Sequence, residues 1–142
     1  MISIDTNIFV YAQNADSPQH RSAFDFITAC GRREDVVLCE LVLVEVYLVL
    51  RSPAVLARPL SAEEAAEVCL TYRRNPRWRL AECAPVMDTV WDKAGESGFA
   101  RRRIIDARLA LTLRQHGVDE FATVNVRDFG DFGFSRVWNP LE

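Results

Sequence analysis

The sequence predicts an α/β fold in which a mostly parallel sheet of four to five strands is covered by helices. Short apolar runs alternate with longer stretches of helical period along the chain. This alternation is typical of βα units, whose strands are buried on both faces. Internal repeats, low-complexity tracts and linkers are absent, and 142 residues suffice for one core. We therefore expect residues 1–142 to form a single domain.

Caps, glycines and prolines set the expected boundaries of the elements. Ser17-Pro18 has the pattern of a helix N-cap followed by proline at the first helical position, and Gly31 ends that helix. Ser61 and Glu64 have the spacing of a capping box. We predict strands over residues 1–4, 36–38, 80–83, 121–124 and 136–138, and helices over about 17–30, 41–52, 61–74, 88–97 and 104–116.

Composition excludes several classes of protein. No apolar run reaches the roughly 18 residues of a membrane span, and no signal peptide is visible, so we expect a cytoplasmic protein that makes no membrane contact. Cys30, Cys39, Cys69 and Cys83 form no C-x-x-C pair, which favours reduced core thiols. The net charge of −3 argues against a protein that simply coats nucleic acid. An enzyme that holds a metal with carboxylates could still act on RNA.

A carboxylate directly follows the first predicted strand. Asp5 opens the sequence Asp5-Thr6-Asn7, and ligands of open α/β sheets bind beyond the carboxyl ends of the strands. Asp5 is therefore well placed to meet a cation. The alternative is that Asp5 caps a helix beginning at Asn7, because Asp is a common N-cap residue. Position alone does not decide between these interpretations.

Glu45 lies inside the almost wholly apolar run from Leu41 to Leu50. Leu41, Val44 and Leu48 have helical spacing, so we expect them on the buried face of a helix, with Glu45 beside that face. An ionised carboxylate in such a place costs several kcal/mol unless it is paired or bound to a metal. The alternative is a buried ion pair with an arginine.

Asp106 repeats this pattern between Ile105 and Ala107, although Asp is a poor residue for a helix interior. The alternative is a first-turn charge that the helix dipole favours. Asn125 and Asp128 follow the fourth predicted strand, at the sheet edge where Asp5 should emerge. Each of these two alone is an ordinary turn residue.

Oxygen-bearing side chains from these segments could converge on one hard cation. Magnesium prefers oxygen ligands, keeps several waters and takes only one or two direct carboxylates. Such a site polarises a phosphate oxygen and activates water for in-line attack. Phosphodiester hydrolysis is therefore the predicted reaction.

Several segments, in order, resemble motifs of PIN-domain ribonucleases, in particular the VapC toxins of bacterial toxin–antitoxin pairs. The matching segments are 4–11, 41–50, 105–107, 123–129 and 137–140. Asp-Thr-Asn alone is a weak match, whereas the ordered set covers nearly the whole chain. The resemblance implies a three-layer α/β/α PIN-like fold and an endoribonuclease that depends on Mg²⁺ or Mn²⁺.

The resemblance also assigns roles to individual residues. Asp5 and Asp106 would bind the metal directly, and Glu45 would complete the acidic cluster or position the attacking water. The family often has Asp where this chain has Asn125, so a second metal is in doubt unless Asp128 supplies the carboxylate. The expected catalytic residues are Asp5, Glu45, Asp106, Asn125 and Asp128, and the expected substrate-binding residues are Thr6, Asn7, Thr123, Arg101, Arg102 and Arg103.

Partners follow from the same resemblance. It implies an RNA substrate, with tRNA or ribosomal RNA as structured targets, a VapB-like antitoxin whose C-terminal segment blocks the site, and a toxin homodimer. The basic run Arg101–Arg103 could bind RNA phosphates or an acidic segment of the antitoxin. The alternative for this run is a solvated helix start.

Two other functions were weighed against this one. A phosphatase with Asp5 as nucleophile would require a second acid where Asn7 stands and a lysine, and Lys93 is the chain's only lysine. A PIN-like protein-binding module that has lost activity would agree with Asn125. It would leave the acids at 5, 45 and 106 unexplained, because unpaired buried carboxylates are costly.

Overall fold

The computed structural model describes residues 1–82, 84–100 and 102–142. Its strands are β1 (Ile2–Ile4), β2 (Val37–Cys39), β3 (Arg79–Ala81), β4 (Glu120–Ala122) and β5 (Arg136–Trp138). Every strand pairing is parallel: β4 lies between β1 and β5, and β2 pairs with β3. A single bridge between Ile2 and Val36 joins the two parts, so the order across the molecule is β3-β2-β1-β4-β5. The predicted parallel sheet is confirmed, in two hydrogen-bonded parts.

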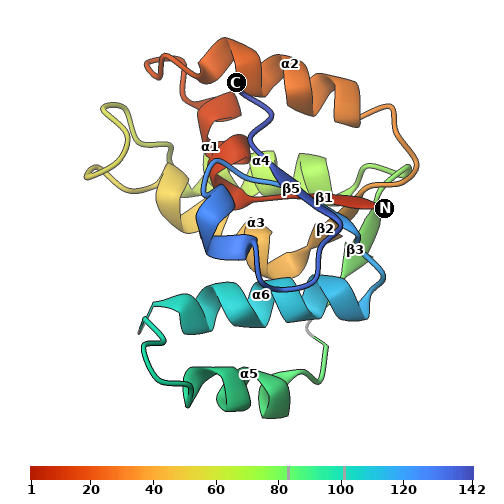
Figure 1. The fold of residues 1–142 in the computed structure, drawn as a ribbon. Coiled ribbons are helices and arrows are strands. Elements are labelled where there is room, and N and C mark those ends of the chain that lie inside the picture. Colours follow the sequence, from red (N-terminus) through yellow and green to blue (C-terminus); the bar gives the residue numbers. More distant parts are fainter. Residues whose placement is uncertain (83, 101) are drawn as a thin grey trace.

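Helices cover both faces of these strands. They are α1 (Thr6–Gln13), α2 (His20–Cys30), α3 (Glu40–Leu50), α4 (Ala62–Arg73), α5 (Met87–Ala94), α6 (Arg103–Gln115) and the short 3₁₀ helix η1 (Val126–Phe129). In Figure 1, α1 and α2 lie on one side of the strands and α6 lies on the other, with α5 beyond α6. The predicted α/β/α layering is therefore confirmed.

Local signals fix most of the helix ends. Ser61 and Glu64 form the predicted capping box of α4, and Gly117 has a φ of +82° directly after α6. The expected N-cap at Ser17 was wrong, because α2 begins at His20. The Ser17 hydroxyl instead accepts from the backbone N–H of Gln19, which stabilises a turn before the helix. Pro18 lies in this turn and therefore outside α2.

The prediction for the buried face of α3 was also wrong. Val42, Val46 and Leu50 are fully buried, whereas Val44 and Leu48 are 52% and 62% exposed. Nearly every residue of this helix is apolar, so the spacing of apolar residues cannot tell which side packs on the sheet. The observed orientation places Glu45 at the edge of the core, where its carboxylate reaches an open pocket.

The expected reduced core thiols agree with Cys30, which is buried and free, and with Cys69, which is partly buried and free. Cys39 is buried, and Cys83 lies outside the described residues. Across the described ranges, the helices all lack the length and apolar character needed to cross a membrane.

Candidate active site

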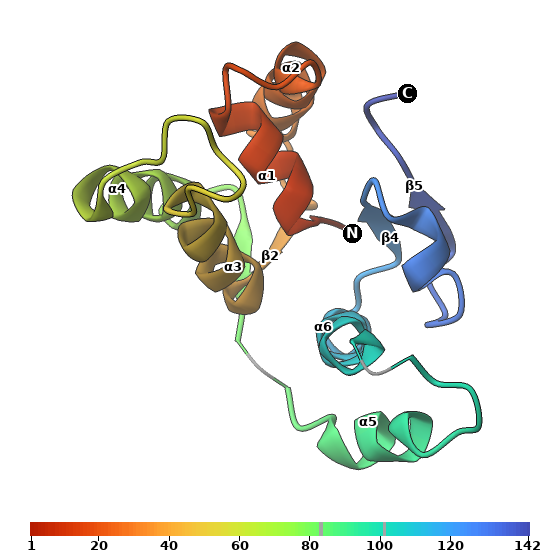
Figure 2. The same cartoon turned by 90° about the vertical axis from the view of Figure 1, so that its left-hand side faces the viewer.

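An open pocket of about 290 Å³ lies where β1 and β4 end and where α1, α3 and α6 meet. Figure 2 shows these three helices around the ends of the strands. Because parallel strands all point the same way, their carboxyl ends deliver side chains to one edge of the sheet. The residues that line the pocket are Asp5, Thr6, Asn7, Val10, Tyr11, Glu45, Val49, Val55, Asp106 and Asn125.

Asp5 is the N-cap of α1, which confirms the capping interpretation, and it also lines the pocket. Its Oδ1 accepts from the backbone N–H of Thr6 at 2.8 Å and so caps α1. Its Oδ2 accepts from the Thr123 hydroxyl at 2.7 Å and from the Asn7 amide at 3.4 Å. Burial raises the pKa of Asp5, and the hydrogen bonds from Thr123 and Thr6 oppose that rise. Capping therefore fixes the orientation of a carboxylate that also lines the pocket.

Thr123 connects the two strand ends. It follows β4 and is fully buried. Its single hydroxyl donates to Asp5 and accepts from the backbone N–H of Asn125 at 3.0 Å. A hydroxyl can play both parts at once. One side chain thus sets the position of Asp5 relative to the loop that follows β4.

Glu45 and Asp106 approach the pocket from α3 and α6. Burial raises the pKa of Glu45, the charges of Asp5 and Asp106 raise it further, and a 3.4 Å hydrogen bond from Thr6 opposes them. Burial, followed by the charges of Asp128 and Asp5, raises the pKa of Asp106 to about 6. The ion pairs found among the described residues include none of the pocket carboxylates. The predicted alternative of a buried Glu45–arginine pair is therefore not observed.

The donor set fits an oxygen-bound divalent cation. Asn7 Oδ1 is buried in the pocket wall without a hydrogen-bond partner, which is costly unless a ligand or water supplies a donor. Within the described residues, no three Asp, Glu, His or Cys side chains are close enough together to hold a metal jointly. A magnesium-type ion would need only one or two direct carboxylates, because it fills its other positions with water. The remaining acids would then act through those waters.

Asn125 and Asp128 flank the pocket from η1. Asn125 lines the pocket, whereas Asp128 does not line it but is near enough for its charge to raise the pKa of Asp5 and Asp106. Both side chains are exposed. The structure thus brings all five predicted catalytic residues to one region, with Asp128 at its margin.

The predicted basic run divides into different environments. Arg101 lies outside the described residues, and Arg102 is exposed at the start of α6. Arg103 Nη2 donates to Asp131 at 2.6 Å, so its charge is directed toward protein. The sequence did not predict the apolar pocket walls, although Val10 and Tyr11 lie three and four residues after Asn7, on the same face of α1.

Comparison with known proteins identifies a family and close relatives. Residues 2–134 match the PIN domain family. The chain is 62% identical to Ribonuclease VapC24 of Mycobacterium tuberculosis, from strain CDC 1551 / Oshkosh and from strain ATCC 25618 / H37Rv, over 99% of this chain and 97% of the relative.

Solved structures show the same fold at lower identity. The structure of Mycobacterium tuberculosis VapC20, described as a sarcin-ricin loop cleaving toxin, aligns with a TM-score of 0.68 and 18% identity, over 93% of this chain and 92% of that one. FitAcB from Neisseria gonorrhoeae aligns with a TM-score of 0.66 and 21% identity, over 99% of this chain and 98% of that one.

Proposed function

The chain belongs to the PIN-domain family and is a ribonuclease of the VapC type, and we propose that it cleaves RNA internally with Mg²⁺ or Mn²⁺ as the toxin of a toxin–antitoxin pair. The observation that carries the proposal is the set of pocket carboxylates Asp5, Glu45 and Asp106, which form no ion pair among the described residues. Asp5 is only 7% exposed there, and its pKa is raised. Perturbed acids in a pocket indicate a functional site.

Asp5 and Asp106 would hold the cation directly. Asp5 is fixed by Thr6 and Thr123, and Asp106 faces it from the first turn of α6. When bound, a divalent cation supplies Lewis-acid activation of the phosphate and of the attacking water. Its positive charge would also lower the raised pKa values of both acids. The orphan Oδ1 of Asn7 would accept a hydrogen bond from water in the pocket.

Glu45 would act as the general base of the reaction. It lies on a different helix from Asp106, is half-buried, and receives the Thr6 hydroxyl at 3.4 Å, which orients its carboxylate. A carboxylate with a raised pKa accepts a proton more readily at neutral pH. In hydrolysis the water oxygen bonds to phosphorus, the water proton passes to Glu45, and the opposite ribose oxygen leaves and takes up a proton.

Asn125 and Asp128 would border this centre where the RNA strand enters, with Asp128 acting on the cation through its bound waters. A second open hollow of about 550 Å³ shares Asn125 with the pocket and is lined also by Arg127, Asp128 and Asn139. We propose one firmly bound cation, and a second that arrives with the substrate, because the amide of Asn125 brings no negative charge. Thr6, Asn7 and the exposed Arg102 would contact the RNA, for which tRNA or ribosomal RNA are the structured candidates.

Partners would cover exposed apolar residues on α3 and on the loop that follows it. Val44 and Leu48 of α3 and Val55, which lines the pocket, are each more than half exposed. Exposed apolar groups around a pocket are typical of protein contacts. A VapB-like antitoxin segment that covers the pocket and a second copy of the chain in a homodimer would each bury such groups. We further propose that residues 1–142 form one domain that acts in the cytoplasm.

The test is cleavage of total RNA by the purified protein with Mg²⁺, with Mn²⁺ or with EDTA. We expect discrete fragments that disappear with EDTA and with Asp5→Asn purified in the same way. Asparagine is also a good N-cap, so this variant should keep α1 intact. If the folded wild type cleaves nothing with either metal, the protein-binding alternative is favoured instead.

A further inference from the structure

Arg103 belongs to the basic run that the sequence suggests for RNA, yet its guanidinium faces the protein. Nη2 donates to Asp131 Oδ1 at 2.6 Å and to the backbone carbonyl of Asp128 at 3.3 Å. Its Cζ lies 5.3 Å from the ring centroid of Phe132 and 5.6 Å from that of Phe99. The side chain is 27% exposed, and its Nε is buried without a hydrogen-bond partner among the described residues, so the protein contacts are made by Nη2 and by the face of the guanidinium. Arg103 is therefore committed to protein contacts.

These contacts join two parts of the proposed metal site. Arg103 lies three residues before Asp106 on α6, so the two side chains share one face of the helix. The carbonyl that it binds belongs to Asp128, within η1, and Asp131 and Phe132 follow directly. The charge of Arg103 also lowers the pKa of Asp106 against the rise that Asp128 causes. One cation thus spans the helix and the loop that carry two mutually repelling acids.

We propose that Arg103 is a positioning residue that holds the η1 loop against α6 and thereby fixes Asp128 relative to Asp106 at the metal site, rather than an RNA-phosphate ligand. This inference rests on the proposed function. An arginine that binds substrate phosphates must offer its N–H groups to solvent, whereas Arg103 directs Nη2 at Asp131 and Asp128 and stacks over two rings. Releasing it for RNA would break a charge-assisted hydrogen bond and two cation–π contacts.

Lysine should not replace Arg103 in this role. A planar guanidinium can donate to a carboxylate and to a carbonyl while its face lies on an aromatic ring, and a compact ammonium group cannot make all of these contacts at once. A phosphate contact, in contrast, depends mainly on charge and tolerates lysine better. Arg103→Lys therefore separates the two roles without changing the net charge.

The experiment measures Mg²⁺ binding and RNA binding separately. The first readout is the Mg²⁺ concentration that gives half of the metal-induced rise in Tm. We expect Arg103→Lys to raise that concentration about tenfold, the size typical for loss of a residue that supports metal ligands. The second readout is RNA affinity at several salt concentrations in EDTA, in an Asp5→Asn background. Positioning predicts an unchanged salt slope, even for Arg103→Ala.

Two further variants keep the result decisive. Asp131→Asn removes the negative charge with which Arg103 pairs and keeps the arginine, so positioning predicts a Mg²⁺ defect in the same direction with RNA binding no weaker. Arg33→Lys is the matched control, because Arg33 pairs with Asp35 at 2.6 Å at the opposite end of the sheet. This control should leave both readouts unchanged.

The outcomes separate this inference from the proposed function. If Arg103→Lys and Asp131→Asn respond to Mg²⁺ as wild type does, while Arg103→Ala reduces the salt slope by about one, Arg103 is an RNA ligand and the inference is wrong. If the wild type itself shows no Mg²⁺-dependent rise in Tm, the proposed metal site fails, and the inference fails with it.

Discussion

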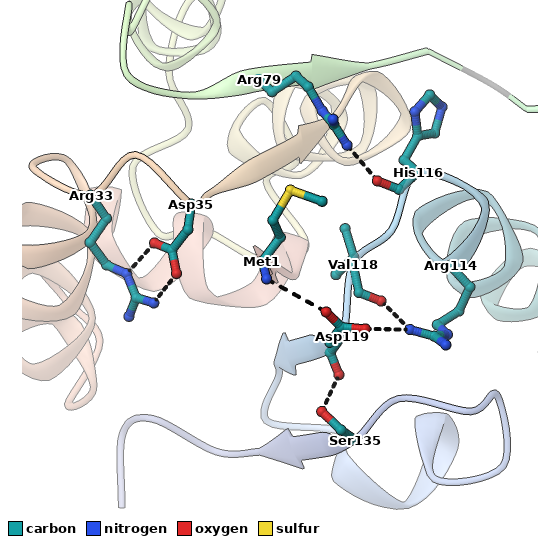
Figure 3. Close-up of polar contacts among 9 residues, drawn as sticks. All are labelled: Met1, Arg33, Asp35, Arg79, Arg114, His116, Val118, Asp119 and Ser135. Atoms are coloured by element: carbon teal, nitrogen blue, oxygen red, sulfur yellow. Dashed lines mark hydrogen bonds and ion pairs between the residues drawn. The ribbon is translucent and has the colours of Figure 1, made fainter.

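The amino and carboxyl ends of the parallel sheet both carry clustered carboxylates, and the two clusters have opposite environments. At the amino end, Arg33 donates to both oxygens of Asp35 at 2.6 and 2.7 Å, and Arg114 donates to Asp119 at 3.1 Å (Figure 3). The hydrogen bond from Arg33 lowers the pKa of Asp35. At the carboxyl end, burial and neighbouring acids raise the pKa of Asp5, Glu45 and Asp106.

This difference separates charges that support the fold from charges that require a ligand. Exposed ion pairs such as Arg33–Asp35 each contribute roughly 0–1 kcal/mol, so the amino end gains modestly from its charges. The carboxyl end loses stability because its acids repel one another and are partly desolvated. Its arrangement does not favour folding, and the cation that we propose for this site would explain it.

The largest expected effect is on catalysis. Asp5→Asn and Asp106→Asn should each reduce RNA cleavage by at least about a hundredfold, because each removes a proposed metal ligand. Asp35→Asn, the same change at the amino end, should leave cleavage within about twofold. Initial rates on a fluorescent RNA at saturating Mg²⁺ measure both effects. Equal losses at the two ends would contradict the comparison.

The hydroxyl that supports Asp5 should matter more than a hydroxyl at the other end. Thr123→Val removes the buried hydroxyl that donates to Asp5 and accepts from the backbone N–H of Asn125. We expect roughly tenfold slower cleavage and a loss of about 1–2 kcal/mol in the free energy of unfolding. Ser135→Ala, which removes an exposed hydrogen bond to the Asp119 carbonyl, should change neither measurably. Urea unfolding and cleavage rates of the same preparations would show any departure.

The two ends should also respond to pH in opposite directions. The pKa of Asp106 is raised from 3.8 to about 6, so the folded protein binds its proton more tightly than the unfolded chain does. Without metal, the free energy of unfolding should therefore fall as pH rises from about 4 to about 6, by about 1 kcal/mol after allowance for solvent screening. Asp35, with its lowered pKa, loses its stabilising effect only as pH falls below about 4.

Urea unfolding in EDTA at several pH values measures this slope. Asp106→Asn should reduce it and raise stability at pH 7, and Mg²⁺ should stabilise the wild type more than the variant. If the wild type and Asp106→Asn change equally in stability between pH 4 and 6 without metal, the pKa of Asp106 is not raised in the folded state.

The smallest effect is expected for the ion pairs of the amino end. Arg33→Ala should lower the free energy of unfolding by less than about 1 kcal/mol, because the pair with Asp35 is solvent-exposed. High salt should reduce the difference in the free energy of unfolding between the wild type and Arg33→Ala, because it screens the ion pair. Differential scanning calorimetry at low and high salt tests this. A loss in the free energy of unfolding larger than about 1 kcal/mol would mean that this ion pair contributes substantially to folding.

The sequence predicted the order of the strands and of the α-helices from α2 onward. It also predicted the convergence of Asp5, Glu45 and Asp106, because parallel strands deliver their following residues to one edge. Helix α1 was expected only in the alternative in which Asp5 is an N-cap. It could not predict the orientation of α3, since that helix is apolar all round and only contact with the sheet buries Val42 rather than Val44. The sequence also could not predict the contacts of Arg103. In a run of three arginines, only partners distant in the sequence, here Asp131 and Phe132, show which side chain packs against the protein.

The pairing of β1 with β4 has a consequence for how the protein comes into being. Ile2 lies opposite Glu120, and Thr123 reaches back to Asp5 across 118 positions of the chain. A growing polypeptide emerges from the ribosome with its earlier residues first, so Asp5 lacks its Thr123 partner until 118 further residues have been made. Contacts between such distant segments also form slowly. The nascent chain therefore lacks a complete pocket until β4 and Thr123 have been synthesised, and the proposed nuclease acquires its active geometry only after that point.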